Sequence, residues 1–144
     1  MQYIYPALLD DRGETIIVSF RDLPEAVTEG RTRGEALAEA TDCLGVALLF
    51  RMKENSAIPL PSQPKPGEVL VPASPSVAAK VAFARAFSES GVTRVALARR
   101  LGLRETEIRR MLDPDHGTKL DRLGDGLRAL GRNLVVSDQP AEAA

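Results

Sequence analysis

Residues 93–112 read TRVALARRLGLRETEIRRML, and this stretch decides the architecture of the second half of the chain. Two short helices that cross around a tight turn need a small residue where their backbones approach, and a residue that tolerates positive φ at the turn. They also need an apolar residue that seats the second helix. Ala98, Gly102 and Ile108 meet these needs in that order. The spacing therefore predicts a helix-turn-helix.

The second helix of this pair has a polar outer face once its apolar side chains are placed in a core. That face consists of Arg104, Glu105, Thr106, Glu107, Arg109 and Arg110. Such a helix can enter the major groove of DNA, where arginine pairs with guanine and threonine meets the methyl group of thymine. An ordinary helical hairpin with a solvated face is the alternative, because Glu105 and Arg109 form an i,i+4 pair that suits an exposed helix.

Helices are also predicted on both sides of this pair. Ser74 and Pro75 have the composition of a helix start, and Gly91 ends the helix that follows them. The single apolar stripe of that helix comprises Val77, Val81, Phe83, Ala84 and Phe87. A loop over residues 113–118 leads to another amphipathic helix over 119–130, and Leu134-Val135-Val136 is expected to form a short strand.

The charge of the chain is divided along its length. The 144 residues carry a formal net charge of −1, but residues 1–62 hold ten acidic and six basic side chains, whereas residues 77–137 hold twelve basic and seven acidic ones. An acidic half and a basic half suggest two modules, of which one meets a polyanion. Near-neutrality of the total is therefore no argument against nucleic acid.

A proline-rich connector of about residues 57–75 separates the halves, because six of the ten prolines lie in it. Within it, residues 68–71 have strand character and are expected to pair with a sheet in the first half. The chain is thus divided into a first α/β module over residues 1–72, a second, all-α module over 74–137, and a tail over 138–144.

The first half has the pattern of a small antiparallel sheet followed by one helix. Two β-rich runs, residues 2–9 and 15–20, flank a turn, and a third short strand covers 26–29. Thr32 and Glu35 form a capping-box pattern at the start of a helix that is expected to end near residue 53. The apolar stripe of this helix comprises Ala36, Leu37, Ala40, Cys43, Leu44, Ala47, Leu48 and Phe50. Cys43 is interpreted as a small core residue and not as a reactive thiol.

These residues resemble the N-terminal domain of HicB antitoxins. The resemblance rests on Tyr3-x-Tyr5, Phe20, Asp22-Leu23-Pro24 and Thr28-x-Gly30-x-Thr32-x-x-Glu35-Ala36-Leu37-x-x-Ala40. It departs from the family pattern at Arg21, which replaces a proline, and at Glu25-Ala26, which replaces a Gly-Cys pair. The resemblance implies an α+β fold, with a small antiparallel sheet against helix in a partial RNase H-like module.

The second half resembles Cro-type repressor domains, and in particular the C-terminal domain of HicB proteins that carry a helix-turn-helix. Besides the stretch 93–112, the resemblance rests on Leu112-Asp113-Pro114-x-His116-Gly117-Thr118-x-Leu120-Asp121-x-Leu123 and Leu127-x-Ala129-Leu130-Gly131. It implies base readers at Glu105, Thr106, Arg109 and Arg110. It also implies DNA-backbone contacts at Thr93, Arg94, Arg104, Thr118 and Lys119. The strand at 134–136 would pair between the two copies of a dimer.

An RNase H-like fold raises the alternative of a nuclease, which needs several carboxylates that converge on two metal ions. The candidates are Asp10, Asp11, Glu14, Asp22, Glu35 and Glu39. Asp10 and Asp11 are placed in the hairpin turn and Glu35 in the cap, so a solvated acidic face is favoured. One cysteine and one histidine exclude the usual zinc ligand sets. No catalytic residue, metal site or cofactor is expected.

The resemblance implies an antitoxin of a type II toxin–antitoxin system. Such a protein would neutralise a HicA-like mRNA interferase, a small basic ribonuclease, by direct binding and would repress its own operon through the helix-turn-helix. The expected partners are this toxin, double-stranded operator DNA and further copies of the chain in a homodimer or higher oligomer. The sequence does not single out toxin-binding residues.

A stand-alone transcriptional repressor with an N-terminal domain that senses a small ligand is the alternative function. The longest strongly apolar run is only residues 46–50, and the N-terminus lacks the pattern of a signal peptide. The expected location is the cytoplasm, with association to the nucleoid when the operator is bound.

Overall fold

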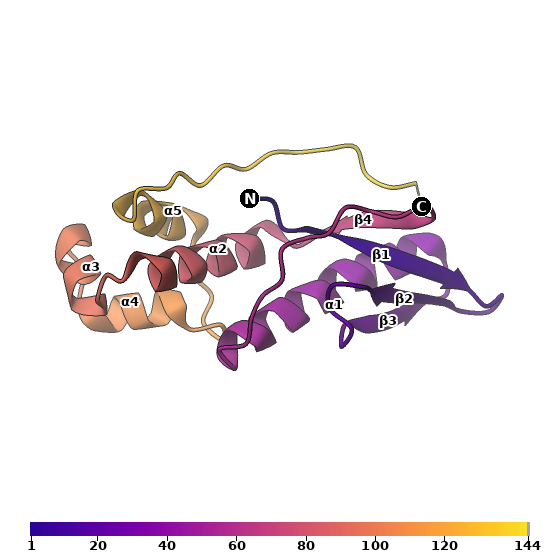
Figure 1. Cartoon of the computed structure of the whole chain (residues 1–144), viewed down its shortest axis with the longest axis horizontal. Helices are drawn as coiled ribbons and strands as arrows, with labels where there is room; N and C mark the ends of the chain where they lie inside the picture. The colour runs from indigo at the N-terminus through magenta and orange to yellow at the C-terminus, as the bar shows by residue number, and fades with distance from the viewer. Residues whose placement is uncertain (144) are drawn as a thin grey trace.

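The computed structural model describes residues 1–143, which form an elongated molecule with a sheet at one end and short helices at the other (Figure 1). The elements are β1 (Ile4–Asp11), β2 (Ile16–Phe20), β3 (Val27–Gly30), α1 (Arg33–Lys53), β4 (Glu68–Pro72), α2 (Pro75–Ser90), α3 (Arg94–Leu101), α4 (Glu105–Leu112) and α5 (Leu120–Ala129). The predicted α+β class is confirmed.

The sheet is antiparallel throughout, with strand order β3-β2-β1-β4. The pairing expected for residues 68–71 is confirmed, since β4 lies beside β1 with Val71 opposite Tyr5. The predicted turn is wrong by two residues, because β1 continues through Asp11, which pairs with Ile16. The turn is closed by a hydrogen bond from the Arg12 N–H to the Thr15 carbonyl (2.8 Å), which leaves both aspartates on the strand.

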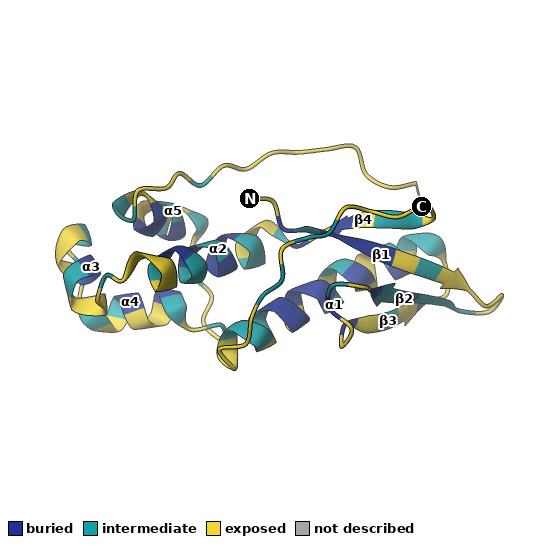
Figure 2. Ribbon diagram, in the orientation of Figure 1, coloured by how far each residue is buried: buried dark blue, intermediate teal, exposed yellow. Residues whose placement is uncertain are grey.

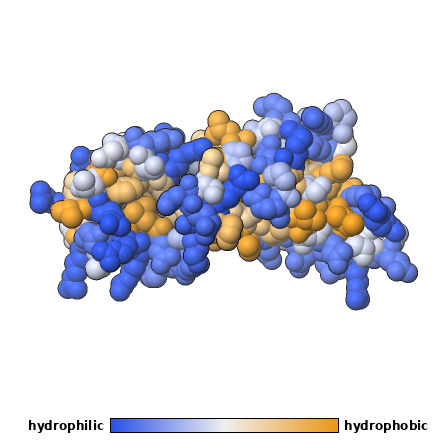
Figure 3. All heavy atoms as spheres, turned by 60° about the horizontal axis from the view of Figure 1, so that its bottom comes forward, coloured by the Kyte–Doolittle hydropathy of each residue, from blue (hydrophilic) through white to orange (hydrophobic). Residues whose placement is uncertain are grey.

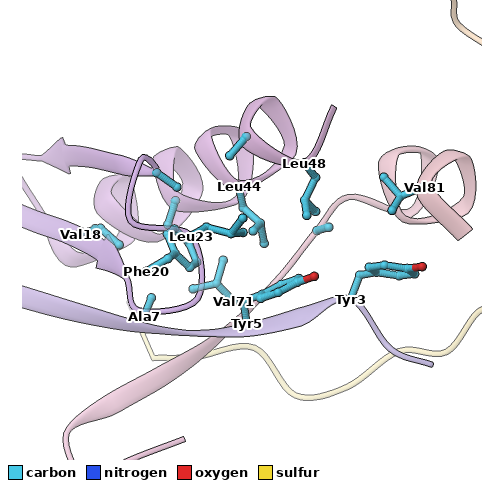
Figure 4. Packing of buried hydrophobic residues seen from close by; sticks show 14 of the residues in the cluster. Tyr3, Tyr5, Ala7, Val18, Phe20, Leu23, Leu44, Leu48, Val71 and Val81 are labelled. Carbon is cyan, nitrogen blue, oxygen red and sulfur yellow. The ribbon is translucent and has the colours of Figure 1, made fainter. Parts of the chain in front are cut away.

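One face of the sheet packs against α1, and the core between them is formed by large side chains from both (Figure 4). Tyr5, Phe20, Leu44 and Leu48 are all at most 2% exposed. One of the two hydrogen bonds predicted for the cap of α1 is confirmed. The Glu35 N–H donates to the Thr32 hydroxyl (3.1 Å), but the Glu35 carboxylate accepts from the N–H of Arg31 and not of Thr32.

The two departures from the family pattern both form ion pairs. Arg21 reaches across β1 to Glu68 on β4 (2.8 Å), and Glu25 binds Arg51 near the end of α1 (3.0 Å between Nη2 and Oε2). The Arg51 guanidinium holds the pKa of the Glu25 carboxyl below its usual range. These charges therefore tie the turn after β2 to the sheet and to α1.

The proline-rich connector is attached to the first core by hydrogen bonds. The Tyr5 hydroxyl donates to the Pro59 carbonyl (2.8 Å), and the Asp22 carboxylate accepts from the backbone N–H of Ser62 (2.8 Å). Burial raises the pKa of Tyr5 to about 12, so this hydroxyl keeps its proton. The connector thus follows a fixed path from α1 to β4.

The helix α2 contributes to two separate cores, so the prediction of one apolar stripe is wrong. Val81 (1% exposed) packs with the sheet and α1, whereas Ala79 and Phe83 (0%) pack with α3, α4 and α5. Figure 2 shows buried residues on α2 between the two ends of the molecule. In the sequence pattern, the apolar residues of two neighbouring helix faces cannot be told apart from a single stripe.

The strand expected at Leu134-Val135-Val136 is absent from the part of the chain that the structure describes. These residues belong to an extended segment without ladder hydrogen bonds, and Val135 is 80% exposed. The end of the segment returns to the start of α1, where Arg33 donates to the Ala143 carbonyl (2.8 Å). Of the predicted tail, residue 144 lies outside the described residues.

Gly30 lies where β3 touches the first turn of α1. A Cβ at this position would lie 2.7 Å from the Cα of Ala36, a backbone atom that cannot move aside. We expect Gly30→Ala to reduce the free energy of unfolding by about 2–3 kcal/mol, measured by urea denaturation. Gly117→Ala is the control, because nothing lies within 4 Å of the position that its Cβ would take. Equal stability of the two variants would contradict this packing.

Candidate nucleic-acid interface

The helices α3 and α4 are joined by a three-residue turn whose local interactions follow the predicted pattern. Thr93 caps α3 by accepting the N–H of Ala96 (3.1 Å), and Gly102 ends it in the left-handed region with φ of 66°. The Leu103 N–H then donates to the Ala98 carbonyl (2.9 Å). Ala98 (4% exposed) and Ile108 (0%) are buried as expected, so α4 is seated on the second core.

Lys80 of α2 holds the far end of α4, a role that the sequence did not reveal. This lysine is 5% exposed, and its ammonium group donates to the carbonyls of Arg110 (3.3 Å), Asp113 (2.7 Å) and His116. Burial lowers the pKa of Lys80, but three carbonyl acceptors match the three N–H donors of the charged form. The positive charge also complements the negative end of the α4 dipole.

Glu105 forms ion pairs with two arginines. Its carboxylate binds Arg94 of α3 (3.1 Å) and Arg109 one turn later on α4 (2.8 Å). Three of the predicted DNA-contacting residues therefore lie together as one ion-pair cluster. In this arrangement Glu105 links α3 to α4 and orients both guanidinium groups.

Arg104 and Glu107 organise the start of α4. The Glu107 carboxylate accepts the backbone N–H of Arg104 (2.8 Å), and this hydrogen bond holds the pKa of Glu107 below its usual range. Glu107 also lies 3.7 Å from Arg122 of α5. One carboxylate thus fixes the first turn of α4 and leaves the Arg104 side chain exposed.

Four further candidates are exposed and unpaired. Within residues 1–143, no hydrogen bond or ion pair engages the side chains of Arg104, Thr106, Arg110 and Lys119. Thr118 lies in the loop before α5, with its hydroxyl 3.5 Å from Nδ1 of His116. Thr106 and Arg110 lie one helical turn apart on α4, and the unpaired cations of Arg104 and Lys119 precede α4 and α5.

The carboxylates of the nuclease alternative do not gather into one site. Asp10 pairs with Arg12 (2.7 Å), Asp22 binds Ser62, and Glu35 accepts the Arg31 N–H. Among residues 1–143, no three His, Cys, Asp or Glu side chains come close enough to hold a metal ion. None of the described helices is both long and apolar enough to cross a membrane.

Replacing Lys80 should destabilise the second core. In Lys80→Met the apolar stem stays, while the hydrogen bonds from a charged donor to the Arg110, Asp113 and His116 carbonyls are lost. The Arg110 and Asp113 carbonyls keep backbone N–H donors, whereas the His116 carbonyl has no other donor among the described residues. A hydrogen bond to a charged group contributes about 1.5–3 kcal/mol. We expect a fall of at least about 2 kcal/mol in the free energy of unfolding from urea denaturation. Lys53→Met is the matched control, because Lys53 reaches the same loop through Asp115 (2.9 Å) but is itself exposed. A neutral Lys80→Met would contradict the role assigned to this lysine.

Comparison with known proteins places the chain in a family. Residues 3–82 match the family model of the HicB-like antitoxin of bacterial toxin–antitoxin systems. The chain is 42% identical to antitoxin HicB 1 of Photorhabdus laumondii over 92% of its own length and 85% of that protein. It is 40% identical to antitoxin HicB of Escherichia coli K12, over 92% and 96% of the two lengths. The chain therefore belongs to the HicB antitoxin family.

Proposed function

We propose that this chain neutralises a HicA-like mRNA interferase by direct binding and represses its own operon. In this proposal residues 1–72 capture the toxin, and residues 74–137 bind operator DNA through a helix-turn-helix made of α3 and α4. The chain itself acts by binding and carries out no catalysis. Membership of an antitoxin family supports the first role, and the exposed face of α4 supports the second.

The observation that carries the DNA-binding role is the set of unpaired polar side chains at α4. Thr106 and Arg110 project from a helix whose other side is fixed by Ile108 and Lys80. A rigidly held helix with an unpaired arginine suits base readout, because bidentate hydrogen bonds to guanine depend on the position of the guanidinium. Arg104 and Lys119, which precede α4 and α5, suit phosphate contacts.

A single helix of eight residues gives few base contacts, so we propose that the chain binds DNA as a dimer. The operator would then be a pseudo-palindrome with half-sites about 34 Å apart, or a multiple of that distance. The affinity should fall with salt, with a slope of roughly −0.9 in log–log form for each phosphate contacted.

The toxin-binding role is supported by charge. Residues 1–62 carry ten acidic and six basic side chains, which complements a small basic ribonuclease. Complementary charge mainly speeds and orients the encounter of two proteins. Neutralisation would follow because the bound antitoxin occludes the RNA-binding or catalytic surface of the toxin.

The alternative, a repressor that senses a small ligand, is supported by one cavity. It has a volume of about 730 Å³ and lies between the start of the chain, α2 and the C-terminal segment, with Tyr3, Ala82, Arg85 and Leu134 among its lining residues. Ligand pockets of small molecules are of this size. A neighbouring reading frame that encodes a small basic protein with one conspicuous histidine would favour the antitoxin, and its absence would favour the sensor.

Substitutions on α4 should separate base readout from phosphate binding. We expect Arg110→Ala and Arg109→Ala to lower the discrimination between operator and unrelated DNA by about 1–3 kcal/mol each. Lys119→Ala should weaken all sequences alike and reduce the salt slope by about 1. Fluorescence anisotropy with operator and scrambled duplexes measures both effects. Arg12→Ala, at the tip of the sheet, is the control. Intact operator binding by both arginine variants would refute the assignment of α4.

Co-expression with the neighbouring small gene tests the antitoxin role. Expression of that gene alone should arrest growth, and the present chain should restore growth and co-purify with its product. A chain that lacks residues 1–32 should lose growth rescue, because its first module is incomplete. Full rescue by Arg110→Ala would show that neutralisation does not need DNA binding. Failure of the full chain to rescue or to co-purify would reject the role.

A further inference from the structure

The helix α1 has a second apolar row that no described part of the chain covers. Val46 is 70% exposed and Phe50 57%, and they are one helical turn apart on the same face. The opposite row, which includes Ala40, Leu44 and Leu48, is fully buried against the sheet. One face of α1 therefore packs in the core, whereas Val46 and Phe50 are exposed to solvent and do not contribute to that core.

Acidic side chains continue this outer face toward the start of the helix. Glu39 and Asp42 precede Val46 by seven and four residues, so all of them share one side of α1. Both carboxylates are exposed, and none of the ion pairs or hydrogen bonds among residues 1–143 involves them. We call Glu39, Asp42, Val46 and Phe50 the α1 stripe.

The composition of the α1 stripe is that of a binding surface. Single exposed apolar residues are common, but an aromatic and an aliphatic side chain on adjacent turns, with charges beside them, are typical of an interface core and its polar rim. Figure 3 turns the lower side of the molecule forward, and hydrophobic surface emerges there among hydrophilic side chains along the part that contains α1 and the sheet. Aromatic anchors of this kind often carry most of the binding energy.

We propose that the α1 stripe is the docking site for the toxin and that it covers the toxin's RNA-binding surface. This inference rests on the proposed function. A ribonuclease must present cations to hold the phosphates of its substrate. The unpaired carboxylates of Glu39 and Asp42 can bind those cations, while Phe50 and Val46 enter an apolar recess beside them. Toxin that is bound in this way cannot bind RNA.

The uncovered face of the sheet is less suited to this partner. Its exposed apolar residues are Leu8 (47%), Val27 (56%) and Leu70 (39%), which lie on three different strands and not on consecutive turns of one helix. The ion pair of Arg21 with Glu68 crosses β1 on that face, so the carboxylate is already neutralised. The α1 stripe combines two unpaired carboxylates with two exposed apolar side chains on one side of a helix.

Binding of the separately purified toxin tests the proposal. The probe is a HicA-like toxin, the small basic protein that the proposed function expects to be encoded beside this chain's gene, made by cell-free synthesis. The readouts are calorimetric titration and protection of an RNA oligonucleotide from cleavage. We expect the double variant Val46→Ser, Phe50→Ser to weaken toxin binding about 30-fold or more and to lose protection. Glu39→Gln with Asp42→Asn should slow association and flatten its salt dependence.

Leu8→Ser is the matched control, because it removes an exposed apolar side chain from the other face of the same module. All variants should keep the circular dichroism spectrum and the operator affinity of the wild type. If the stripe variants bind toxin with wild-type affinity, or if only Leu8→Ser loses toxin binding, the α1 stripe is not the docking site, although the antitoxin role stands. A stripe variant that becomes monomeric but still binds toxin would show that the face joins copies of this chain, and would also overturn it. A wild-type chain that binds no toxin would reject the proposed function itself.

Discussion

The packing of α2 into two cores is the constraint on which the rest of the molecule depends. Val81 closes the core of the sheet and α1, and Phe83, two residues later, closes the core of the short helices. At Gly126, α5 approaches so closely that a Cβ would lie 2.5 Å from the Phe83 ring. Neither core can rearrange without moving this helix. The acidic and basic halves of the chain are therefore held in a fixed relation to each other.

Lys80 directly precedes Val81 on α2 and extends the same constraint to α4. Its ammonium group binds the last carbonyls of α4 and the loop before α5. The ion pairs of Glu105 with Arg94 and Arg109 fix the other end of α4. A buried charge costs desolvation, and that cost is offset here because every donor has an acceptor. In this account α2 holds the proposed DNA-reading face in position. The α1 stripe lies on the side of α1 that faces away from the first core.

Local sequence signals predicted most of the elements, because they act within a few residues. Thr32 and Thr93 cap their helices, Gly91 and Gly102 end theirs with positive φ, and residues 68–71 pair as their β-branched composition indicates. These features depend on backbone geometry that the residue itself determines. Their positions could therefore be read without knowledge of the tertiary structure.

The features that the sequence did not reveal depend on contacts between distant segments. Lys80 lies in a run of apolar residues, and nothing in its neighbours indicates that three carbonyls from residues 110–116 surround it. The sequence pattern places Phe50 in the inner stripe of α1, but Phe50 is 57% exposed, because it lies two residues after the buried Leu48 and so on the other side of the helix. Leu134-Val135-Val136 has strand composition but finds no neighbouring strand among the described residues. A single sequence does not encode such partners locally.

The coupling of the two cores through α2 is the central claim, and an unfolding experiment tests it directly. The chain has no tryptophan, and its only tyrosines are Tyr3 and Tyr5, both in the first core, so tyrosine fluorescence reports on that core alone. Phe83→Leu perturbs only the second core. The account predicts that this variant lowers the urea midpoint seen by tyrosine fluorescence as much as the midpoint seen by amide hydrogen exchange in α4. An unchanged tyrosine midpoint, with only α4 destabilised, would contradict it.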